Sequence, residues 1–336
     1  MATLRMPAEW EPHEATWISW PKNLETFGQM LPRVEKIFLQ IVGALHKGEK
    51  VNILVDDDAT EERVRRMLEE AGVKRNVFFY RVKSADVWVR DYGPIFVKSG
   101  KKRLITKWIF NAWGGKYSDL AEDTQVFDRL APSLGFEVLR PEIVLEGGSI
   151  EVNGKGTLLT TEQCLLNKNR NPQLTKAQIE GYLGDYLGAS NVIWLKDGVV
   201  GDDTDGHIDD IARFVNPTTV LCALEDDRID PNHAALRQNF ELLANAKDQD
   251  GEKLEVVPLP MPGPVKGPEG RLPASYVNFY IGNDAVLLPV FDHKNDMAAI
   301  SLLGKCFPGR KVVPINCEPL LWGLGTIHCS TQQQPR

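Results

Sequence analysis

The sequence predicts an α/β fold made of repeated units, each with two strands, a helix and a third strand. Four stretches read as β-hairpins that begin about 55 to 65 residues apart, and such regular spacing indicates structural repeats. Helical patterns and lone strands follow these hairpins. The first three hairpins come directly after a polar residue close to glycine or tyrosine.

The N-terminal segment predicts alternating strands and helices. Val34, Phe38 and Ile41 recur at helical spacing, and Asp58 is expected to start a second helix that Gly72 ends. The predicted elements are strands at 15–20, 51–55 and 77–80 and helices at 31–47 and 58–71.

Four repeat units follow. Asn153-Gly154 is a strong hairpin signal, and Thr175 with Gln178 forms a capping box that starts a helix. The predicted hairpins are 94–97 with 104–110, 149–152 with 157–160, 211–215 with 219–223, and 277–281 with 285–290; helices lie near 121–133, 176–187, 232–245 and 295–304, and lone strands at 191–195, 254–257 and 311–314.

The N-terminal segment and a strand at Cys329 are candidates for the two halves of a fifth unit. Units arranged about an axis would bring their polar hairpin openings together at the centre. A single open α/β sheet would have similar strand and helix content and remains the alternative.

Composition narrows the function classes. The chain has 336 residues and a formal net charge of −7, without the basic stripe that nucleic-acid binding requires. No apolar run approaches the length of a membrane span, and five cysteines lack paired spacing. We therefore expect a cytoplasmic protein without disulfides, zinc knuckle, nucleic-acid partner or membrane partner.

Residues 1–336 are expected to form one domain. The Pro- and Gly-rich stretch 257–274 has no periodicity and is interpreted as an exposed loop, a candidate lid, and not as a domain boundary.

The segment around Cys329 is the first candidate for chemistry. Gly323 and Gly325 let the backbone approach a bound molecule, and the alternation of Thr326 to Cys329 reads as a short strand. The cysteine could be a nucleophile, or it could be an inert packing residue, because free cysteines are commonly buried.

The stretch 201–210 holds the densest group of polar residues. A calcium loop fails there, because aligning Gly206 with the invariant glycine puts Ala212 where a glutamate is needed. A solvated acidic loop or a carboxylate metal site stays open. Alternation in a strand would instead place His207 and Asp209 on one side and Ile208 on the other.

Asp91 and Glu146 offer two more carboxylates near glycines. Pairing of Asp91 with Arg90, or a capping role for Glu146, are the structural alternatives. Carboxylates together with one Cys and one His suggest attack on a guanidinium carbon, because that planar cation presents N–H donors on either side.

Seven segments resemble the agmatine deiminases, which are grouped with the Porphyromonas-type peptidylarginine deiminases. They span residues 7 to 335 and read MPAEWEPHEATWISWP, VWVRDYGPIFV, FNAWGGK, EGGSIEVNGKGTLLTTEQCLLNKNRNP, TDGHIDD, ASYVNFYI and GTIHCSTQQQP. The resemblance implies a five-bladed pseudo-symmetric α/β propeller, the pentein or guanidine-modifying fold. It also implies hydrolysis of agmatine to N-carbamoylputrescine and ammonia, no metal or organic cofactor, and a homodimer.

The resemblance also implies catalytic roles by motif. Cys329 would be the nucleophile, and His207 would protonate departing ammonia and then activate water against a thiouronium intermediate. Asp91 and Asp209 would grip the guanidinium nitrogens, and Glu146 would orient His207.

For substrate binding, the resemblance suggests Trp88 and Trp113 as walls for the aliphatic chain and Asp203 as a partner for the far amine. Gly325 would let the backbone approach the substrate.

Three positions depart from the pattern usual in this family. Leu324 and Thr326 replace a glycine and an asparagine, and Asp205 replaces an asparagine. A bulkier Leu324 and an extra acid at the mouth would alter which guanidines fit. Agmatine hydrolysis is the leading hypothesis; conversion of arginine to citrulline in peptides and a catalytically silent binding protein are the alternatives.

Overall fold

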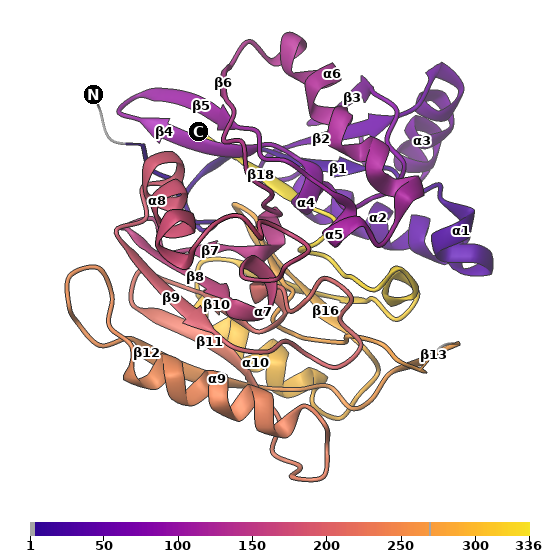
Figure 1. The fold of residues 1–336 in the computed structure, drawn as a ribbon. Helices are drawn as coiled ribbons and strands as arrows, with labels where there is room; N and C mark the ends of the chain where they lie inside the picture. The colour runs from indigo at the N-terminus through magenta and orange to yellow at the C-terminus, as the bar shows by residue number, and fades with distance from the viewer. Residues whose placement is uncertain (1–3, 269) are drawn as a thin grey trace.

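The computed structural model describes residues 4–268 and 270–336 and has a mixed α/β fold (Figure 1). In this described part, four three-stranded sheets share one pattern, an antiparallel pair of strands followed by a parallel strand. Their strands are β4 (Ile95–Ser99), β5 (Lys102–Thr106) and β6 (Glu137–Leu139); β7 (Glu151–Val152), β8 (Thr157–Thr161) and β9 (Asn191–Leu195); β10 (Ala212–Phe214), β11 (Thr219–Leu224) and β12 (Glu255–Pro260); β15 (Tyr280–Ile281), β16 (Ala285–Val290) and β17 (Lys311–Asn316).

Both ends of the chain join in one further sheet. It holds β18 (Gln332–Pro335), β1 (His13–Ser19), β2 (Lys50–Val55) and β3 (Val77–Arg81) in that order. β18 runs antiparallel to β1 and the other neighbours are parallel, so the yellow C-terminal strand lies beside the indigo N-terminal one (Figure 1). The predicted fifth unit is thus confirmed, but the strand predicted at Cys329 is wrong, because Cys329 lies in a turn and the strand begins three residues later.

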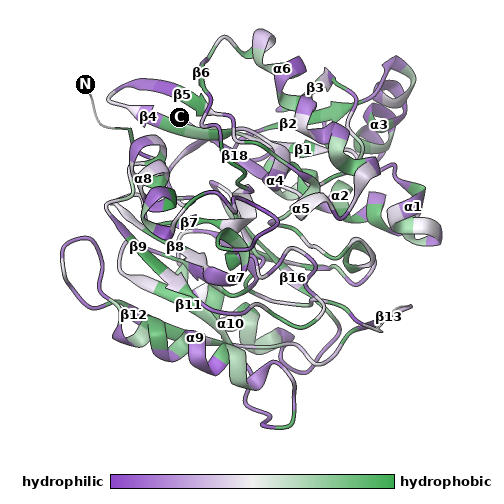
Figure 2. Cartoon of the chain, in the orientation of Figure 1, coloured by the Kyte–Doolittle hydropathy of each residue, from purple (hydrophilic) through white to green (hydrophobic). Residues whose placement is uncertain are grey.

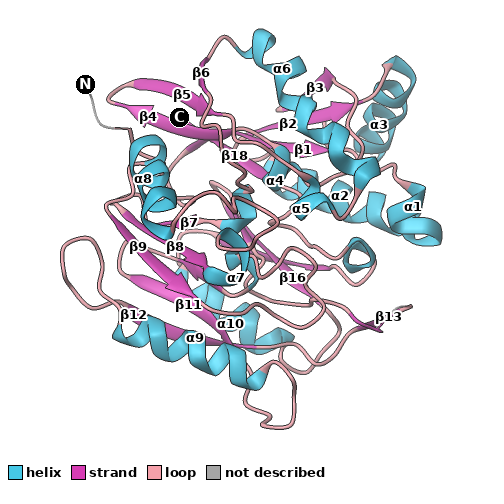
Figure 3. Ribbon diagram, viewed as in Figure 1, coloured by secondary structure: helices cyan, strands magenta, loops and turns pink. Residues whose placement is uncertain are grey.

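Each longer helix connects two parallel strands of one sheet and lies at the outside of the molecule (Figure 3). These helices are α2 (Leu31–Leu45), α3 (Asp58–Glu70), α6 (Val126–Leu134), α8 (Lys176–Leu187), α9 (His233–Asn245) and α10 (Asp296–Cys306). Shorter helices are α1 (Leu24–Phe27), α4 (Val89–Tyr92), α5 (Ala112–Gly115) and α7 (Glu162–Leu165).

Local sequence signals explain where the helices begin. The capping box at α8 is confirmed, since Thr175 accepts from the backbone of Gln178 and the Gln178 side chain accepts in return. At α3 the prediction was one residue late, because Asp57 is the N-cap and accepts from Thr60 N at 2.8 Å.

The apolar side chains form two buried clusters. The larger joins residues from most of the sheets, and the smaller fills the space among β4, β5, β7 to β9 and α8. Strands β2 and β11 are largely green and the outer helices mix green and purple in Figure 2, as amphipathic elements packed on a core should. No helix within the described residues is both long and apolar enough to cross a bilayer.

The stretch 257–274 is more ordered than predicted. Its first residues complete β12, and β13 (Lys266–Gly267) pairs with β14 (Gly270–Arg271) as a small hairpin that projects from the molecule (Figure 1). Leu272 and Pro268 line a cavity, so this stretch borders the candidate site described below.

The polar residues that precede the hairpins lie in short helical turns and not in strands. Asp91 is in α4, Glu146 precedes a 3₁₀ turn at Gly147–Ser149, and Asp209 is within another at Ile208–Asp210. The turn at Gly147–Ser149 contacts both of the others, so the expected convergence of the hairpin openings is confirmed although the secondary structure expected there is not.

Candidate active site

Cys329 lies in a tight turn and opens onto a cavity of about 520 Å³. Asn278 Nδ2 donates to its sulfur at 3.1 Å. The Asn278 oxygen is occupied by the Thr326 hydroxyl at 2.6 Å and by His328 N at 3.0 Å, so the amide is fixed with its NH₂ group toward sulfur. This arrangement stabilises a thiolate when it forms.

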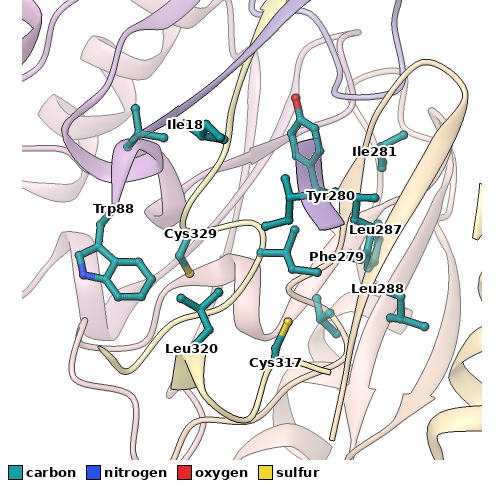
Figure 4. Packing of buried hydrophobic residues seen from close by; sticks show 14 of the residues in the cluster. Ile18, Trp88, Phe279, Tyr280, Ile281, Leu287, Leu288, Cys317, Leu320 and Cys329 are labelled. Atoms are coloured by element: carbon teal, nitrogen blue, oxygen red, sulfur yellow. The ribbon is translucent and has the colours of Figure 1, made fainter. Parts of the chain in front are cut away.

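Trp88 stands beside the sulfur, and the two side chains are seen at one side of the apolar cluster in Figure 4. Gly325 separates them. A Cβ at position 325 would lie 2.6 Å from the Trp88 ring and 3.2 Å from Cys329 Cβ, so only glycine fits there. Trp88, Trp113, Asp203 and Gly325, the four predicted substrate-binding residues, all line the cavity.

Asp91 is held in place from two sides. Its Oδ1 accepts from Gly148 N at 2.9 Å and its Oδ2 accepts from Trp113 Nε1 at 3.0 Å. Trp113 adopts a left-handed backbone with φ 53°, which costs roughly 1 to 2 kcal/mol and is typical of functional sites. No pairing of Asp91 with Arg90 is found; Arg90 instead donates to Glu9 at 3.2 Å.

His207 faces two carboxylates. Its Nδ1 lies 3.8 Å from Asp91 Oδ1 and 4.0 Å from Asp209 Oδ1. Within the described chain, neither ring nitrogen of His207 nor Asp209 Oδ1 has a hydrogen-bond partner. The strand alternation predicted for residues 207–209 is wrong, since they form a 3₁₀ turn, but the two side chains do come together.

Asp209 is fully buried and its second oxygen is occupied. Oδ2 accepts from His328 Nδ1 at 2.6 Å and lies 3.8 Å from Cys329 Sγ. His328 Nε2 in turn donates to Glu9 Oε2 at 2.8 Å.

Glu146 is not hydrogen-bonded to His207, contrary to the simplest form of the predicted orienting role. Its Oε1 accepts from Arg170 Nε at 2.6 Å, while Oε2 has no partner among the described residues. An oxygen of Glu146, a nitrogen of His207 and the sulfur of Cys164 nevertheless lie within 4.8 Å of one another. Glu146 therefore acts on His207 through its charge.

The charges shift the titration of these groups. Burial raises the pKa of Asp91 to about 6 even though His207 lowers it. Burial lowers the pKa of His207, but Asp91, Cys164 and Glu146 outweigh it and hold that pKa well above its usual value. Burial raises the pKa of Cys329 well above that of a free thiol, and Asp209, Asp210 and Asp91 raise it further. The resting site thus favours a neutral thiol and a charged imidazole.

The cavity wall carries acids and aromatic rings. Its charged lining residues, within the part of the chain described, are all acidic: Glu25, Asp86, Asp91, Asp119 and Asp203. Lys116 lies just behind this wall, 3.4 Å from Asp203, and so partly neutralises the mouth. A cation with an apolar chain suits this wall.

The three unusual positions differ in their distance from the cavity. Leu324 lines it and has a left-handed backbone with φ 64°. Asp205 does not line it, because its carboxylate bonds to Arg170 at 2.7 Å and Asn169 at 2.9 Å; the expectation of an extra acid at the mouth is wrong. Thr326 acts behind the sulfur, on Asn278.

Two clusters have donor atoms close enough to share a metal ion, namely Glu146 with Cys164 and His207, and Asp209 with Asp210 and Cys329. The carboxylates of these two clusters can equally accept hydrogen bonds from a bound organic cation.

Several residues at the site were not found from the sequence alone. Asn278, His328 and Cys164 lie in the motifs ASYVNFYI, GTIHC and EQC, but their side chains read as ordinary strand or core residues. Arg170 and Glu9 also lie within quoted motifs, but no role was predicted for them. A buried ion pair between distant segments leaves no local pattern in a sequence.

The family model of the Porphyromonas-type peptidyl-arginine deiminases matches residues 5–335. The chain belongs to this family. An agmatine deiminase of Pseudomonas aeruginosa is 39% identical over 98% of this chain and 95% of its own. The solved agmatine deiminase of Enterococcus faecalis is 34% identical with a TM-score of 0.92, over 99% of this chain and 96% of its own.

An amidinotransferase of Streptomyces griseus shares the fold alone, with 13% identity and a TM-score of 0.55 over 100% of this chain and 97% of its own. The family match and the two agmatine deiminases confirm the resemblance noted in the sequence. The chain is an enzyme of the deiminase kind, a hydrolase of carbon–nitrogen bonds.

Proposed function

We propose that this protein hydrolyses agmatine to N-carbamoylputrescine and ammonia through a thiouronium intermediate on Cys329. The observation that carries the proposal is that Cys329 and Asp91 line an acid-walled cavity, with buried His207 and Asp209 close beside them. Agmatine has a guanidinium at one end and an ammonium at the other, and the wall of this cavity carries Asp203 and other carboxylates besides Asp91.

Substrate binding follows from the unused acceptors. Asp209 Oδ1 has no partner among the described residues, and Asp91 keeps acceptor capacity beyond its two hydrogen bonds. A guanidinium between them would present its carbon to the Cys329 sulfur. Trp88 and Trp113 would flank the methylene chain and Asp203 would receive the ammonium.

The first half-reaction forms a carbon–sulfur bond. The arriving cation favours loss of the Cys329 proton to solvent water, and Asn278 stabilises the thiolate. The thiolate attacks the guanidinium carbon to give a tetrahedral adduct. Protonated His207 donates its proton to one NH₂ group, the carbon–nitrogen bond breaks, and ammonia leaves.

The second half-reaction releases the product. Neutral His207 takes a proton from water as the water oxygen attacks the thiouronium carbon. The carbon–sulfur bond then breaks, the electron pair returns to sulfur, the hydroxyl proton of the adduct passes to that sulfur, and a ureido product forms. Glu146, close to His207, favours its charged form in both half-reactions.

The five sheets fit the blades of a pseudo-symmetric α/β propeller, with the contacting turns of the hairpin openings at its axis. We place the reaction in putrescine and polyamine metabolism because its product is a carbamoylated diamine. We further propose that residues 1–336 act as one domain.

The experiment is to mix the protein with agmatine, quench in acid within the turnover time, and weigh the peptide that contains Cys329. The proposal expects an adduct with the mass of agmatine less one ammonia. Turnover without such an adduct, with Cys329→Ala still active, would overturn the covalent mechanism.

A further inference from the structure

His328 stands between two buried carboxylates directly beside the nucleophile. Its Nδ1 lies 2.6 Å from Asp209 Oδ2 and its Nε2 lies 2.8 Å from Glu9 Oε2, and all three residues are buried. Ionised carboxylates only accept hydrogen bonds, so the ring donates from each nitrogen.

Both carboxylates are held in the ionised form. Burial raises the pKa of Asp209, but the hydrogen bond and charge of His328 together with the charges of His207 and Arg213 outweigh it, and the net shift is downward. Burial likewise raises the pKa of Glu9, and Arg213, His328 and Arg90 together bring it well below its usual value.

Glu9 is itself fixed from several segments. Its Oε1 accepts from Ile281 N at 2.8 Å and lies 2.9 Å from Arg213 Nη2, and Arg90 Nη2 donates to Oε2 at 3.2 Å. Glu9 thus gives the imidazole of His328 a rigid support on the side away from Asp209.

The two carboxylate oxygens of Asp209 therefore have different roles. Oδ2 is occupied by His328, whereas Oδ1 has no partner in the described chain and lies 4.0 Å from His207 Nδ1. If the carboxylate could rotate, either oxygen could face the substrate, and both could form hydrogen bonds with other donors of the protein.

We propose that His328 is a positioning residue for Asp209, with Glu9 as its support: it fixes Oδ2 so that Oδ1 remains the acceptor for a guanidinium or amidinium nitrogen. The inference deepens the proposed function and rests on it for the identity of the substrate, but not for the recognition of a planar cation. A merely structural His328 would neutralise buried charge without affecting cation recognition.

Two matched variants separate these roles. In His328→Asn the amide nitrogen can take the place of Nδ1 and still donate to Asp209, whereas in His328→Gln it takes the place of Nε2 and reaches Glu9 only. The probes are 2-chloroacetamidine, a planar cation, and 2-chloroacetamide, its neutral counterpart, and the readout is the alkylation rate of Cys329 with each.

For His328→Gln we expect the amidine rate to fall about 10- to 100-fold, the cost of an unsatisfied buried acceptor, with the amide rate unchanged within about threefold. His328→Asn should keep the wild-type ratio of the two rates within about threefold. Equal losses with both probes, or an unchanged ratio in His328→Gln, would overturn the proposal.

Glu9→Gln covers the case in which His328→Gln fails to fold. Its amide oxygen still accepts from the ring but without charge, and a fall of about three- to tenfold in the amidine-to-amide ratio is expected. An unchanged ratio contradicts the role of Glu9. If the wild-type protein is alkylated selectively by the amidine but does not hydrolyse agmatine, the proposed substrate is wrong. The positioning role of His328 would not be contradicted by that result.

Discussion

At the scale of single residues, the site combines a thiol that resists ionisation with an imidazole that resists deprotonation. Burial and the charges of Asp209, Asp210 and Asp91 raise the pKa of the Cys329 thiol, whereas Asp91, Cys164 and Glu146 raise the pKa of His207 against the effect of burial. A cation bound among these carboxylates would lower the pKa of the Cys329 thiol and leave the His207 imidazole charged. Recognition of the substrate and activation of the nucleophile are therefore one event in this account.

The pH dependence tests that coupling. The pKa of Asp91 is raised to about 6, so below this pH its carboxyl is neutral and the grip on a guanidinium is lost. We expect kcat/KM to fall about tenfold per pH unit below pH 6.

Trp113→Phe should move this acid limb upward, because it removes the Nε1–H donor that stabilises the Asp91 carboxylate. Trp108→Phe is the control, since its Nε1 donates to Thr106 at 2.9 Å, away from the cavity. An acid limb that stays at the same pH in Trp113→Phe would show that Asp91 does not control it.

Leu324 is the residue at which this chain is expected to restrict its substrates. It lines the cavity and has a left-handed backbone, which costs free energy for leucine but which glycine adopts freely. Leu324→Gly should increase kcat/KM for guanidines with one extra methylene group relative to agmatine, as measured in competition.

Asn76→Gly is the matched control, because Asn76 also has a positive φ of 58° but lies in the turn before β3. If both variants change the preference equally, the effect is one of backbone flexibility and not of cavity shape.

At the scale of elements, periodicity predicted most strands and helices correctly, because a strand or helix of this length carries its own burial pattern. It failed at the three turns that carry Asp91, Glu146 and Asp209. These turns are fully buried and are shaped by their contacts with one another, so no local alternation marks them.

The loop that contains Asp205 is tied to the site through Arg170. This guanidinium is fully buried and donates to Glu146, to Asp205 and to Thr204 O. Arg170→Ala would leave the buried Glu146 unpaired, so we expect a loss of about 3 to 5 kcal/mol in the free energy of unfolding.

Arg140→Ala is the control, since Arg140 pairs with Asp128 in an exposed setting and should cost at most about 1 kcal/mol. Denaturant titration measures both. Equal losses in the two variants would contradict the buried role of Arg170.

At the scale of the whole molecule, the sequence indicated the repeat, the union of the two chain ends and most site residues. It did not indicate the central ion network of Glu9, Arg90, Arg213, Glu151 and His328. These residues come from distant segments, and only the packing of the sheets brings them together.

The assembly is a prediction at the same scale. We propose a homodimer, as the family resemblance implies. Light scattering after gel filtration should give twice the mass of the 336-residue chain at micromolar concentration. A mass of one chain at all concentrations tested would contradict it.

The most direct test of the central claim is ammonia release from agmatine, free arginine and a blocked arginyl peptide, measured side by side with Cys329→Ala. We expect release from agmatine alone, because the cavity is lined by acids without a cation to receive a carboxylate in its described wall, and we expect none from Cys329→Ala. Release from the peptide, or activity that survives in Cys329→Ala, would contradict the account.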